Sequence, residues 1–361
     1  SDEAGTTLTS KSGRPIGREG LELGRPVDGV ELVEGQAVLA LSHLPDQPGM
    51  AAQLFETLSA GGVNVDLIIQ STHEGSSNDI TFTVAAAELG KARELCEALL
   101  QTIGGQLTAD VNMTKLSISG AGIMGRPGIA ASLFNTLSRA GINLRLIATS
   151  EVKVSCVIDA ELGGKALRAV STAFELNDNQ LKINPLVNGI DEPEVRGVAL
   201  DRDQAQVSVK RVPNRPGTAA ALCSALAEAG ISLDAIVQSE RQHSDGSRDI
   251  SFTLKKEDRH QADKALAPLL AQWSGAILEE GPAIARVSAV GAGMPATAGT
   301  AGRMFRALAD ANINIAMIAT SEIRTSCVVA ESDGVAALQA VHAGFGLGGQ
   351  QQHPPQGSAS R

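Results

Sequence analysis

One sequence pattern occurs four times in this chain of 361 residues, and any fold must accommodate every copy. Each copy starts at a glycine, which follows proline in three copies and alanine in the fourth, and each has a serine 22 residues later. The glycines are Gly49, Gly128, Gly217 and Gly299, and the serines are Ser71, Ser150, Ser239 and Ser321. A pattern repeated in register over this length indicates four small domains rather than one large domain.

The residues after each glycine follow a helical period. In the first copy the spacing i, i+3, i+4, i+7 is occupied by Ala51, Leu54, Phe55 and Leu58, which form one apolar face of an α-helix. The same positions are apolar in the other copies. We expect the prolines to lie in the first helical turn, where the missing N–H would have no partner anyway.

Strand-like segments flank these helices. In the first unit we predict strands at 27–33, 36–44, 63–70, 80–85 and 106–113, with a second helix at 88–100. In the second unit we predict strands at 115–119, 143–149 and 152–158, and helices at 127–140 and 164–174. The order β-α-β-β-α-β predicts an α+β fold, in which an antiparallel sheet carries both helices on one face, as in the ferredoxin-like sandwich.

The chain also repeats at a larger scale, because its second half matches the first at an offset of 168 to 171 residues. For example, Asp79–Thr83 returns as Asp249–Thr253. The plan is therefore two tandem pairs of unlike units, A-B-linker-A-B, with their sheets joined side by side. We predict a linker or the end of a preceding domain at 1–26, domains at 27–113, 114–176, 195–284 and 285–346, a linker at 177–194 and a disordered tail at 347–361.

Composition excludes several classes of function. The net charge of −10 argues against nucleic acid or an anionic membrane surface as the main partner. No run of 18 apolar residues and no signal-peptide pattern is present, so we expect a cytoplasmic protein. Cys96, Cys156, Cys223 and Cys327 stand apart in apolar surroundings. We interpret them as buried hydrophobic residues, and the sequence predicts no metal site.

One motif suggests a nucleotide-binding site, whereas three common catalytic motifs are missing from the sequence. Gly120–Gly125 matches G-x-G-x-x-G, but its equivalent Gly291–Ala296 lacks the third glycine, and the unit is too short for a dinucleotide fold. We therefore interpret it as a tight strand-to-helix turn, with a dinucleotide-dependent enzyme as the alternative. No phosphate loop, nucleophile elbow or H-E-x-x-H motif occurs, so we expect no catalytic residues in this chain.

The A units carry a different constellation. Asp46 stands just before a predicted helix, whose N-terminal amides and positive dipole end suit an anion. The helix would bind the carboxylate of a free amino acid, Asp46 its ammonium group, and Gln70 would add an amide at the same sheet edge. The alternative is that Asp46 only caps the helix, and the residues alone leave both interpretations open.

These motifs together resemble the ACT domains of aspartate kinases. Segments 46–51, 63–70 and 79–83 resemble the first ACT domain of that family, and segments 120–124, 141–144 and 147–151 resemble the second. The resemblance covers about residues 27–346, and the doubled pair is similar to the cyanobacterial aspartate kinases. Residues 1–10 resemble the last stretch of the kinase domain of that family, whose Lys-Phe-Gly-Gly start is absent from the sequence.

The resemblance implies a regulatory module of aspartate kinase, an enzyme that phosphorylates the side-chain carboxyl group of L-aspartate with ATP. Such modules bind lysine and/or threonine and inhibit the pathway to lysine, threonine and methionine. The resemblance implies no cofactor in this chain, since ATP and Mg belong to the kinase domain. It also implies two partners, namely the kinase domain and a second copy of the chain. An A unit facing a B unit would form the effector site. The residues that it implies are Asp46, Gly49, Met50, Ala51, Gln70, Asn214, Gly217, Thr218, Ala219 and Gln238 on the A side, and Asn143, Leu144, Ser150, Glu151, Asn314, Ile315, Ser321 and Glu322 on the B side.

Within one chain, we expect the first unit to pair with the fourth and the third with the second. The two A units differ, because Asp46 becomes Asn214 and Asn64 becomes Ser232. Asparagine accepts a hydrogen bond from an ammonium group without the assistance of charge, so the Asn214 site should be weaker, differently selective or empty. The competing hypothesis is a structural dimerisation module with vestigial effector sites.

Overall fold

The computed structural model describes residues 26–73, 77–123, 125–150, 152–185, 194–238, 242–291, 294, 299–321 and 323–347. The predicted N-terminal linker up to residue 25, the hairpin tip at 74–76 and the tail from residue 348 lie outside the described residues. Glu151 and Glu322, both predicted as site residues, also lie outside them.

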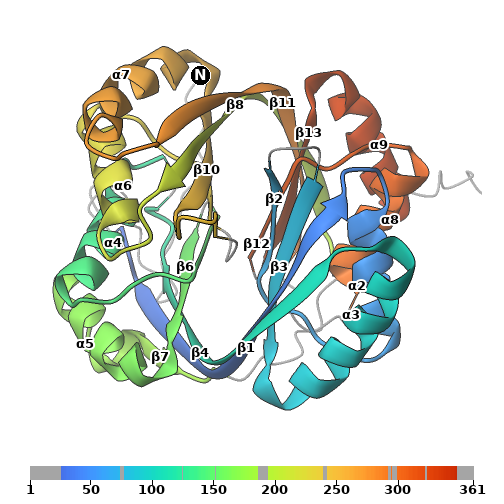
Figure 1. Ribbon diagram of the computed structural model, residues 1–361, viewed down its shortest axis with the longest axis horizontal. Coiled ribbons are helices and arrows are strands. Elements are labelled where there is room, and N and C mark those ends of the chain that lie inside the picture. The colour runs from blue at the N-terminus through green and yellow to red at the C-terminus, as the bar shows by residue number, and fades with distance from the viewer. Residues whose placement is uncertain are drawn as a thin grey trace, which may run out of the picture.

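In the described part of the chain, eight α-helices lie in two layers, one on each outer side, and the strands lie between these layers (Figure 1). The helices are α2 (Met50–Ala60), α3 (Leu89–Ile103), α4 (Ile129–Arg139), α5 (Gly163–Ala173), α6 (Thr218–Glu228), α7 (Arg259–Leu270), α8 (Thr300–Asp310) and α9 (Gly334–Gly344). Figure 1 shows α4–α7 on one side and α2, α3, α8 and α9 on the other. None of the helices in the described segments is long and apolar enough to cross a membrane.

The strands of the described chain form one 13-stranded mixed sheet. They are β1 (Gly29–Pro45), β2 (Ile68–His73), β3 (Ser77–Ala85), β4 (Gln106–Ser119), β5 (Leu146–Thr149), β6 (Lys153–Asp159), β7 (Leu181–Ile183), β8 (Gly197–Val212), β9 (Ala235–Gln238), β10 (Arg248–Lys255), β11 (Ile277–Val290), β12 (Met317–Ser321) and β13 (Arg324–Ala330). Their order is β3-β2-β12-β13-β11-β8-β10-β9-β5-β6-β4-β1-β7. Because β1 also pairs with β3, the sheet closes on itself and leaves only β7 outside the ring.

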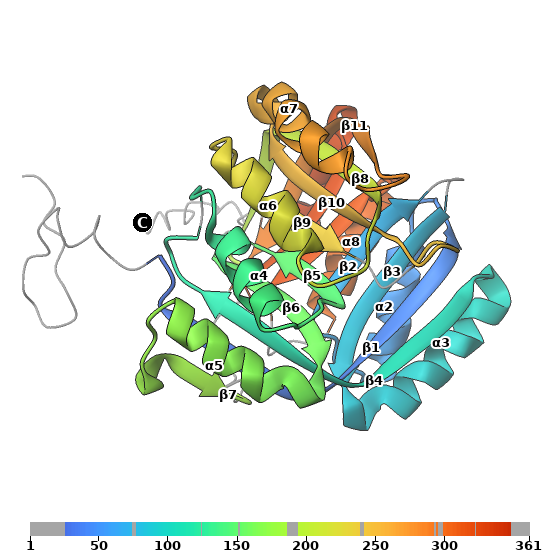
Figure 2. The same cartoon turned by 60° about the vertical axis from the view of Figure 1, so that its left-hand side comes forward.

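The predicted pairing of units is confirmed within a single chain. β2 of the first unit pairs antiparallel with β12 of the fourth, and β5 of the second pairs with β9 of the third. On the outer surface α4 lies beside α6 (Figure 2), with a hydrogen bond from Asn135 Nδ2 to Ser224 Oγ of 2.9 Å. We call the β2–β12 contact the 1–4 seam and the β5–β9 contact the 3–2 seam. The fold class predicted from the repeats, ferredoxin-like units with joined sheets, is confirmed.

Each repeated glycine sets the start of its helix. Gly49, Gly128 and Gly217 all have φ of 97°, and Gly299 has φ of 90°, a left-handed conformation that side chains with a Cβ atom rarely adopt. The helix begins at the next residue in every copy. Pro48 therefore precedes the helix. The sequence analysis had predicted that this proline lies in the first helical turn.

Two long strands connect neighbouring units. β1 and β4 pair with each other from Gly29↔Ser119 to Ser42↔Gln106, with register shifts between Val33 and Val38. Val30 and Leu32 pack in the core that contains Phe134 of the second unit, whereas the later residues of β1 pack in the core of the first and fourth units. The boundary predicted at residue 113 thus falls within a continuous strand, and 27–33 contribute side chains to the second unit.

The predicted linker 177–194 contains a strand that the sequence analysis missed. β7 pairs in parallel with β1, and the N–H of Asn184 donates to the carbonyl of Leu32 at 2.8 Å. The side chain of Asn184 accepts a bond of 2.7 Å from the N–H of Glu34. A run of only three residues is too short for its alternation to identify a strand, so this pairing depends on contacts remote in sequence.

The four cysteines are buried, as predicted. Burial raises the pKa of the thiols of Cys156 and Cys223 to about 12, and it does the same for Cys96, with a smaller contribution from Glu97. Burial also raises the pKa of Cys327. A thiol that stays protonated at neutral pH is a poor nucleophile and metal ligand, so these residues pack as small apolar side chains.

Candidate functional site

Asp46 lies in the loop between β1 and α2, where the first unit faces the fourth. Its Oδ1 atom accepts hydrogen bonds of 2.7 Å from Asn78 Nδ2 of the first unit and from Asn314 Nδ2 of the fourth. The first residue before α2 is Gly49, and no side chain caps this helix. The carboxylate therefore binds amides from two units rather than the helix N-terminus, which counts against the interpretation as a simple cap.

A second bond crosses the 1–4 seam beside Asp46. The buried side chain of Gln70 donates from Nε2 to the backbone carbonyl of Ile315 at 2.5 Å. Gln70 and Ile315 line a pocket of about 10 Å³ together with Gly49, Met50 and Ala51. Asn78 and Asn314, the two amides that bind Asp46, line it as well. The structure thus brings together seven of the predicted residues, namely Asp46, Gly49, Met50, Ala51, Gln70, Asn314 and Ile315.

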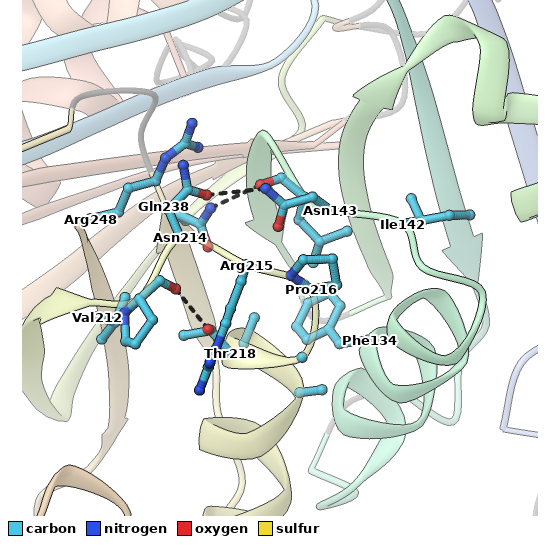
Figure 3. A pocket seen from close by; sticks show the side chains of 15 residues that line it. Phe134, Ile142, Asn143, Val212, Asn214, Arg215, Pro216, Thr218, Gln238 and Arg248 are labelled. Carbon is cyan, nitrogen blue, oxygen red and sulfur yellow. Dashed lines mark hydrogen bonds between the residues drawn. The ribbon is translucent and has the colours of Figure 1, made fainter. Parts of the chain in front are cut away.

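The equivalent pocket at the 3–2 seam has a volume of about 20 Å³. Asn143 Nδ2 donates to Asn214 Oδ1 at 3.1 Å, and Gln238 Nε2 donates to the carbonyl of Leu144 at 3.1 Å. Figure 3 shows Asn143, Asn214 and Gln238 directed toward one another. The remaining predicted residues of this site, Gly217, Thr218 and Ala219, line the same pocket.

The pocket at the 3–2 seam contains an arginine that the sequence analysis missed. Arg248 is 1% exposed, and its Nη1 atom donates to the carbonyl of Arg145 at 2.9 Å. It stands where the first unit has Asn78, since both residues precede the matching segments that begin at Asp79 and Asp249. Aligning the two copies residue by residue, as for Asp46 and Asn214, would have revealed this change.

Ser150 and Ser321, which the resemblance groups with these residues, do not line these two pockets. Asn314 precedes β12 and Ser321 ends it, so the two residues lie at opposite ends of a strand of 5 residues. At roughly 3.3 Å per residue this separates them by about 13–16 Å. Ser321 lines a different cavity of about 260 Å³ at the 1–4 seam, together with Asn64, Asp66 and Lys115. Ser150 lines its small counterpart of about 30 Å³ at the 3–2 seam.

The side chains equivalent to the lining of the large cavity differ between the two seams. At the 3–2 seam Arg286 Nη2 lies 3.2 Å from Asp201 Oδ2, and Gln204 Nε2 donates to both Asp201 and Asp234, at 2.9 and 2.5 Å. At the 1–4 seam the residue equivalent to Asp201 is the short, apolar Val33.

The arginine is replaced as well. Lys115 takes the place of Arg286 at the 1–4 seam, and it pairs with Asp66. Val33 and Lys115 both line the large cavity. The large cavity is thus lined by an apolar residue and a lysine at the two positions where the 3–2 seam has the pair Asp201–Arg286.

The two seams also differ between their helices. Arg306 of α8 forms a two-point ion pair with Glu56 of α2, which lowers the pKa of the Glu56 carboxyl chiefly through the hydrogen bond. The equivalent pair between α4 and α6 is the neutral Asn135–Ser224 contact. One seam is thus joined by charges, the other by a neutral hydrogen bond.

Comparison with known proteins identifies the repeated unit. Two family models, both described as ACT domain, match this chain: one at residues 42–99, 116–174 and 287–345, the other at 205–272. A solved structure of aspartate kinase from Synechocystis is 45% identical, with a TM-score of 0.86, and the match covers 92% of this chain and 58% of that one.

Curated relatives point in the same direction. An aspartokinase of Thermus thermophilus is 40% identical over 159 residues, 44% of this chain and 39% of the relative. An aspartokinase of Helicobacter pylori is 42% identical over 158 residues, 44% of this chain and 38% of the relative. The matches thus span about two fifths of the length of these relatives. The chain belongs to the ACT-domain family, carries four ACT domains, and is similar over them to aspartate kinases.

Proposed function

We propose that this chain is the allosteric regulatory part of an aspartate kinase and that it binds lysine and/or threonine as feedback inhibitors. Similarity to the Synechocystis enzyme over 92% of this chain supports the proposal. In this proposal catalysis, with ATP and Mg, belongs to a kinase domain outside residues 27–346. A homodimer and a cytoplasmic location remain part of the same proposal.

The observation that carries the proposal is the position of Asp46. Its carboxylate lies between two units and beside the start of α2, where free amide groups and the helix dipole favour an anion. A free amino acid offers both complementary charges. In this arrangement its carboxylate binds the α2 amides, its ammonium group binds Asp46, and Gln70 and Asn314 supply neutral hydrogen-bonding groups.

The small volume of the pocket couples binding to conformation. A cavity of about 10 Å³ holds about one water molecule, so an amino acid can enter only if the first and fourth units move apart. The 1–4 seam is narrow, because β2 and β12 pair through Gln70↔Ile318 and Ile69↔Ala319. A ligand that binds the opened seam more tightly than the closed seam shifts the equilibrium toward the opened state. In this proposal, that shift is the signal passed to a kinase domain.

The large cavity offers a second amino-acid position at the same seam. Its volume of about 260 Å³ suits a small ligand without rearrangement, and Asp66, which is 37% exposed and pairs with Lys115, has a second carboxylate oxygen for a ligand ammonium group. Size favours the longer lysine here and a threonine-sized ligand beside Asp46. Ser321 contributes to this second position rather than to the Asp46 pocket.

Calorimetry with L-lysine and L-threonine tests the proposal. We expect saturable binding, and we expect Asp46→Ala to weaken the ligand of its pocket at least tenfold, because a charge-assisted bond is lost. Glu94→Ala, which removes an exposed carboxylate on α3, is the matched control and should leave both affinities unchanged. NAD should give no binding. If neither amino acid binds, or if Asp46→Ala has no effect on either, the Asp46 assignment fails and the structural dimerisation hypothesis gains support.

A further inference from the structure

We propose that Asn78 is a specificity-determining residue of the Asp46 pocket, and that its side-chain oxygen accepts a hydrogen bond from a hydroxyl group of the ligand. The ligand class is then a β-hydroxy-α-amino acid, of which serine and threonine are the simplest members. This inference rests on the proposed function, because it assumes that an amino acid binds beside Asp46. It adds one residue to the site and one required chemical group to the ligand.

The two polar atoms of the Asn78 side chain differ in their surroundings. Nδ2 donates to Asp46 Oδ1 at 2.7 Å, whereas Oδ1 is buried and has no hydrogen-bond partner among the described residues. Asn78 is 2% exposed and lines the same pocket as Met50 and Gln70. A buried acceptor without a partner destabilises a fold, so such an atom requires an explanation. A hydrogen-bond donor on a bound ligand provides one.

Strand register places Asn78 beside the other groups of the first unit. β3 pairs with β2 through Thr72↔Asn78, so Asn78 lies on the same face of the sheet as Gln70, two residues before Thr72. β3 also pairs with β1 through Leu44↔Asn78, and Asp46 follows Leu44 by two residues. These side chains and the amides of α2 therefore belong to one unit.

The closed pocket of about 10 Å³ can open without separating these groups. An opening of the 1–4 seam breaks contacts to the fourth unit, namely the bond from Asn314 Nδ2 to Asp46 Oδ1 and the bond from Gln70 Nε2 to the carbonyl of Ile315. The bond between Asn78 and Asp46 lies within the first unit and is retained. A ligand in the opened seam thus meets Asp46 and Asn78 as neighbouring acceptors, in the room that the movement of the fourth unit provides.

A β-hydroxy-α-amino acid matches two neighbouring acceptors of this kind. Its ammonium and hydroxyl groups stand on adjacent carbon atoms, and both donate hydrogen bonds. In the proposed site the ammonium group binds the carboxylate of Asp46 through a charge-assisted bond, and the hydroxyl group donates to Asn78 Oδ1. Valine and lysine have no donor on the β-carbon, so either ligand would leave this buried oxygen without a partner. A site with such an unpaired group discriminates strongly against a ligand that lacks the hydroxyl group.

The 3–2 seam supplies a comparison within the same chain. Arg248 stands at the position of Asn78, and Asn214 stands at the position of Asp46. The guanidinium group of an arginine only donates hydrogen bonds, so Arg248 cannot accept one from a ligand hydroxyl group. At this position, an acceptor for a hydroxyl group is present at the 1–4 seam and absent from the 3–2 seam.

Calorimetry of the full chain with L-threonine and L-valine tests this inference, because the two ligands have nearly the same size and only threonine carries the hydroxyl group. We expect threonine to bind about tenfold or more tightly than valine. Asn78→Ala removes the acceptor, so it should reduce the ratio of the two affinities to about one. L-Serine and L-alanine form a second pair that differs only in the hydroxyl group, and they should give the same result. Asn135→Ala, the same substitution on α4, is the matched control and should preserve the ratio.

The ratio is the informative quantity, because Asn78→Ala also removes a bond to Asp46 and thereby weakens both ligands. The inference is overturned if the unaltered chain binds valine as tightly as threonine, if the preference survives Asn78→Ala, or if neither threonine nor serine binds. The first comparison needs no variant, so it decides the matter even if Asn78→Ala does not fold.

Asp46→Ala separates this inference from the proposed function. If Asp46→Ala weakens threonine and valine alike but the unaltered chain does not distinguish them, only the role of Asn78 is contradicted. If threonine is preferred and Asn78→Ala removes the preference, while Asp46→Ala leaves both affinities unchanged, only the proposed function is contradicted.

Discussion

The two seams of this molecule have the same backbone and different chemistry. At both, a threonine hydroxyl accepts a backbone N–H at 2.8 Å, from Ile68 to Thr320 in one and from Ile236 to Thr149 in the other. Only the 1–4 seam has the carboxylate of Asp46, a cavity of about 260 Å³ and an ion pair between its helices. The duplicated architecture therefore preserves the scaffold, while the charged groups and the cavity differ between the seams.

The largest difference that we expect concerns the aromatic contacts behind the seams. Phe305 is buried against Phe55 with ring centroids 5.4 Å apart, whereas its equivalent Phe134 faces the position of Cys223. Each Phe→Ala substitution should cost about 3–5 kcal/mol through lost burial and a cavity. Phe305→Ala should cost about 0.5–1.5 kcal/mol more, because it also breaks an aromatic pair. Urea unfolding of both variants measures this difference, and a larger cost at Phe134 would contradict the comparison.

A smaller effect is expected from exchanging the residues that distinguish the pockets. Asp46→Asn gives the first pocket the residue of the second, and it should weaken the amino acid bound there by about tenfold, since the bond to the ammonium group loses its charge assistance. The substitution keeps the size of the side chain, so the fold should be preserved. Calorimetry at constant ionic strength measures the change. Equal affinities for the variant and the parent would show that the charge of Asp46 does not select the ligand.

The smallest effect is a dependence of the 1–4 seam on pH. The bond from Arg306 lowers the pKa of Glu56, so its stabilising contribution is present above the unfolded pKa of about 4.5 and is lost as the pH falls through the lower folded value. The pair is 43% exposed on both sides, so we expect only about 0.2–1 kcal/mol. The difference in unfolding free energy between the parent and Glu56→Gln should therefore decrease as the pH falls below the unfolded pKa of about 4.5. The neutral pair Asn135–Ser224 provides the control, because the effect of Asn135→Ala should not depend on pH.

The elements that depend on local pattern were predictable from the sequence. The apolar stripe of Leu54, Phe55 and Leu58 identified α2, and the offset between the two halves predicted which units face each other. The seam residues Asp46, Asn314 and Gln70 followed from the family resemblance together with this pairing.

What the sequence did not predict depends on contacts between distant segments. β7 is defined by its pairing with β1, and the continuity of β4 through residue 113 follows from its pairing with β1 along one sheet that runs through both units. The motif around Ser321 does not show that this residue lies at the opposite end of β12 from Asn314. Arg248 was not predicted because only the fold brings this residue of β10 beside Asn214 and Gln238.

The central claim is that an amino acid bound beside Asp46 opens the 1–4 seam. Amide hydrogen exchange measured with and without lysine and threonine tests this most directly, by comparing segment 68–70 with its equivalent 236–238. We predict faster exchange on ligand addition in 68–70, no change in 236–238, and no response in Asp46→Ala. Equal responses at both seams, or a response at the 1–4 seam that persists in Asp46→Ala, would contradict the account.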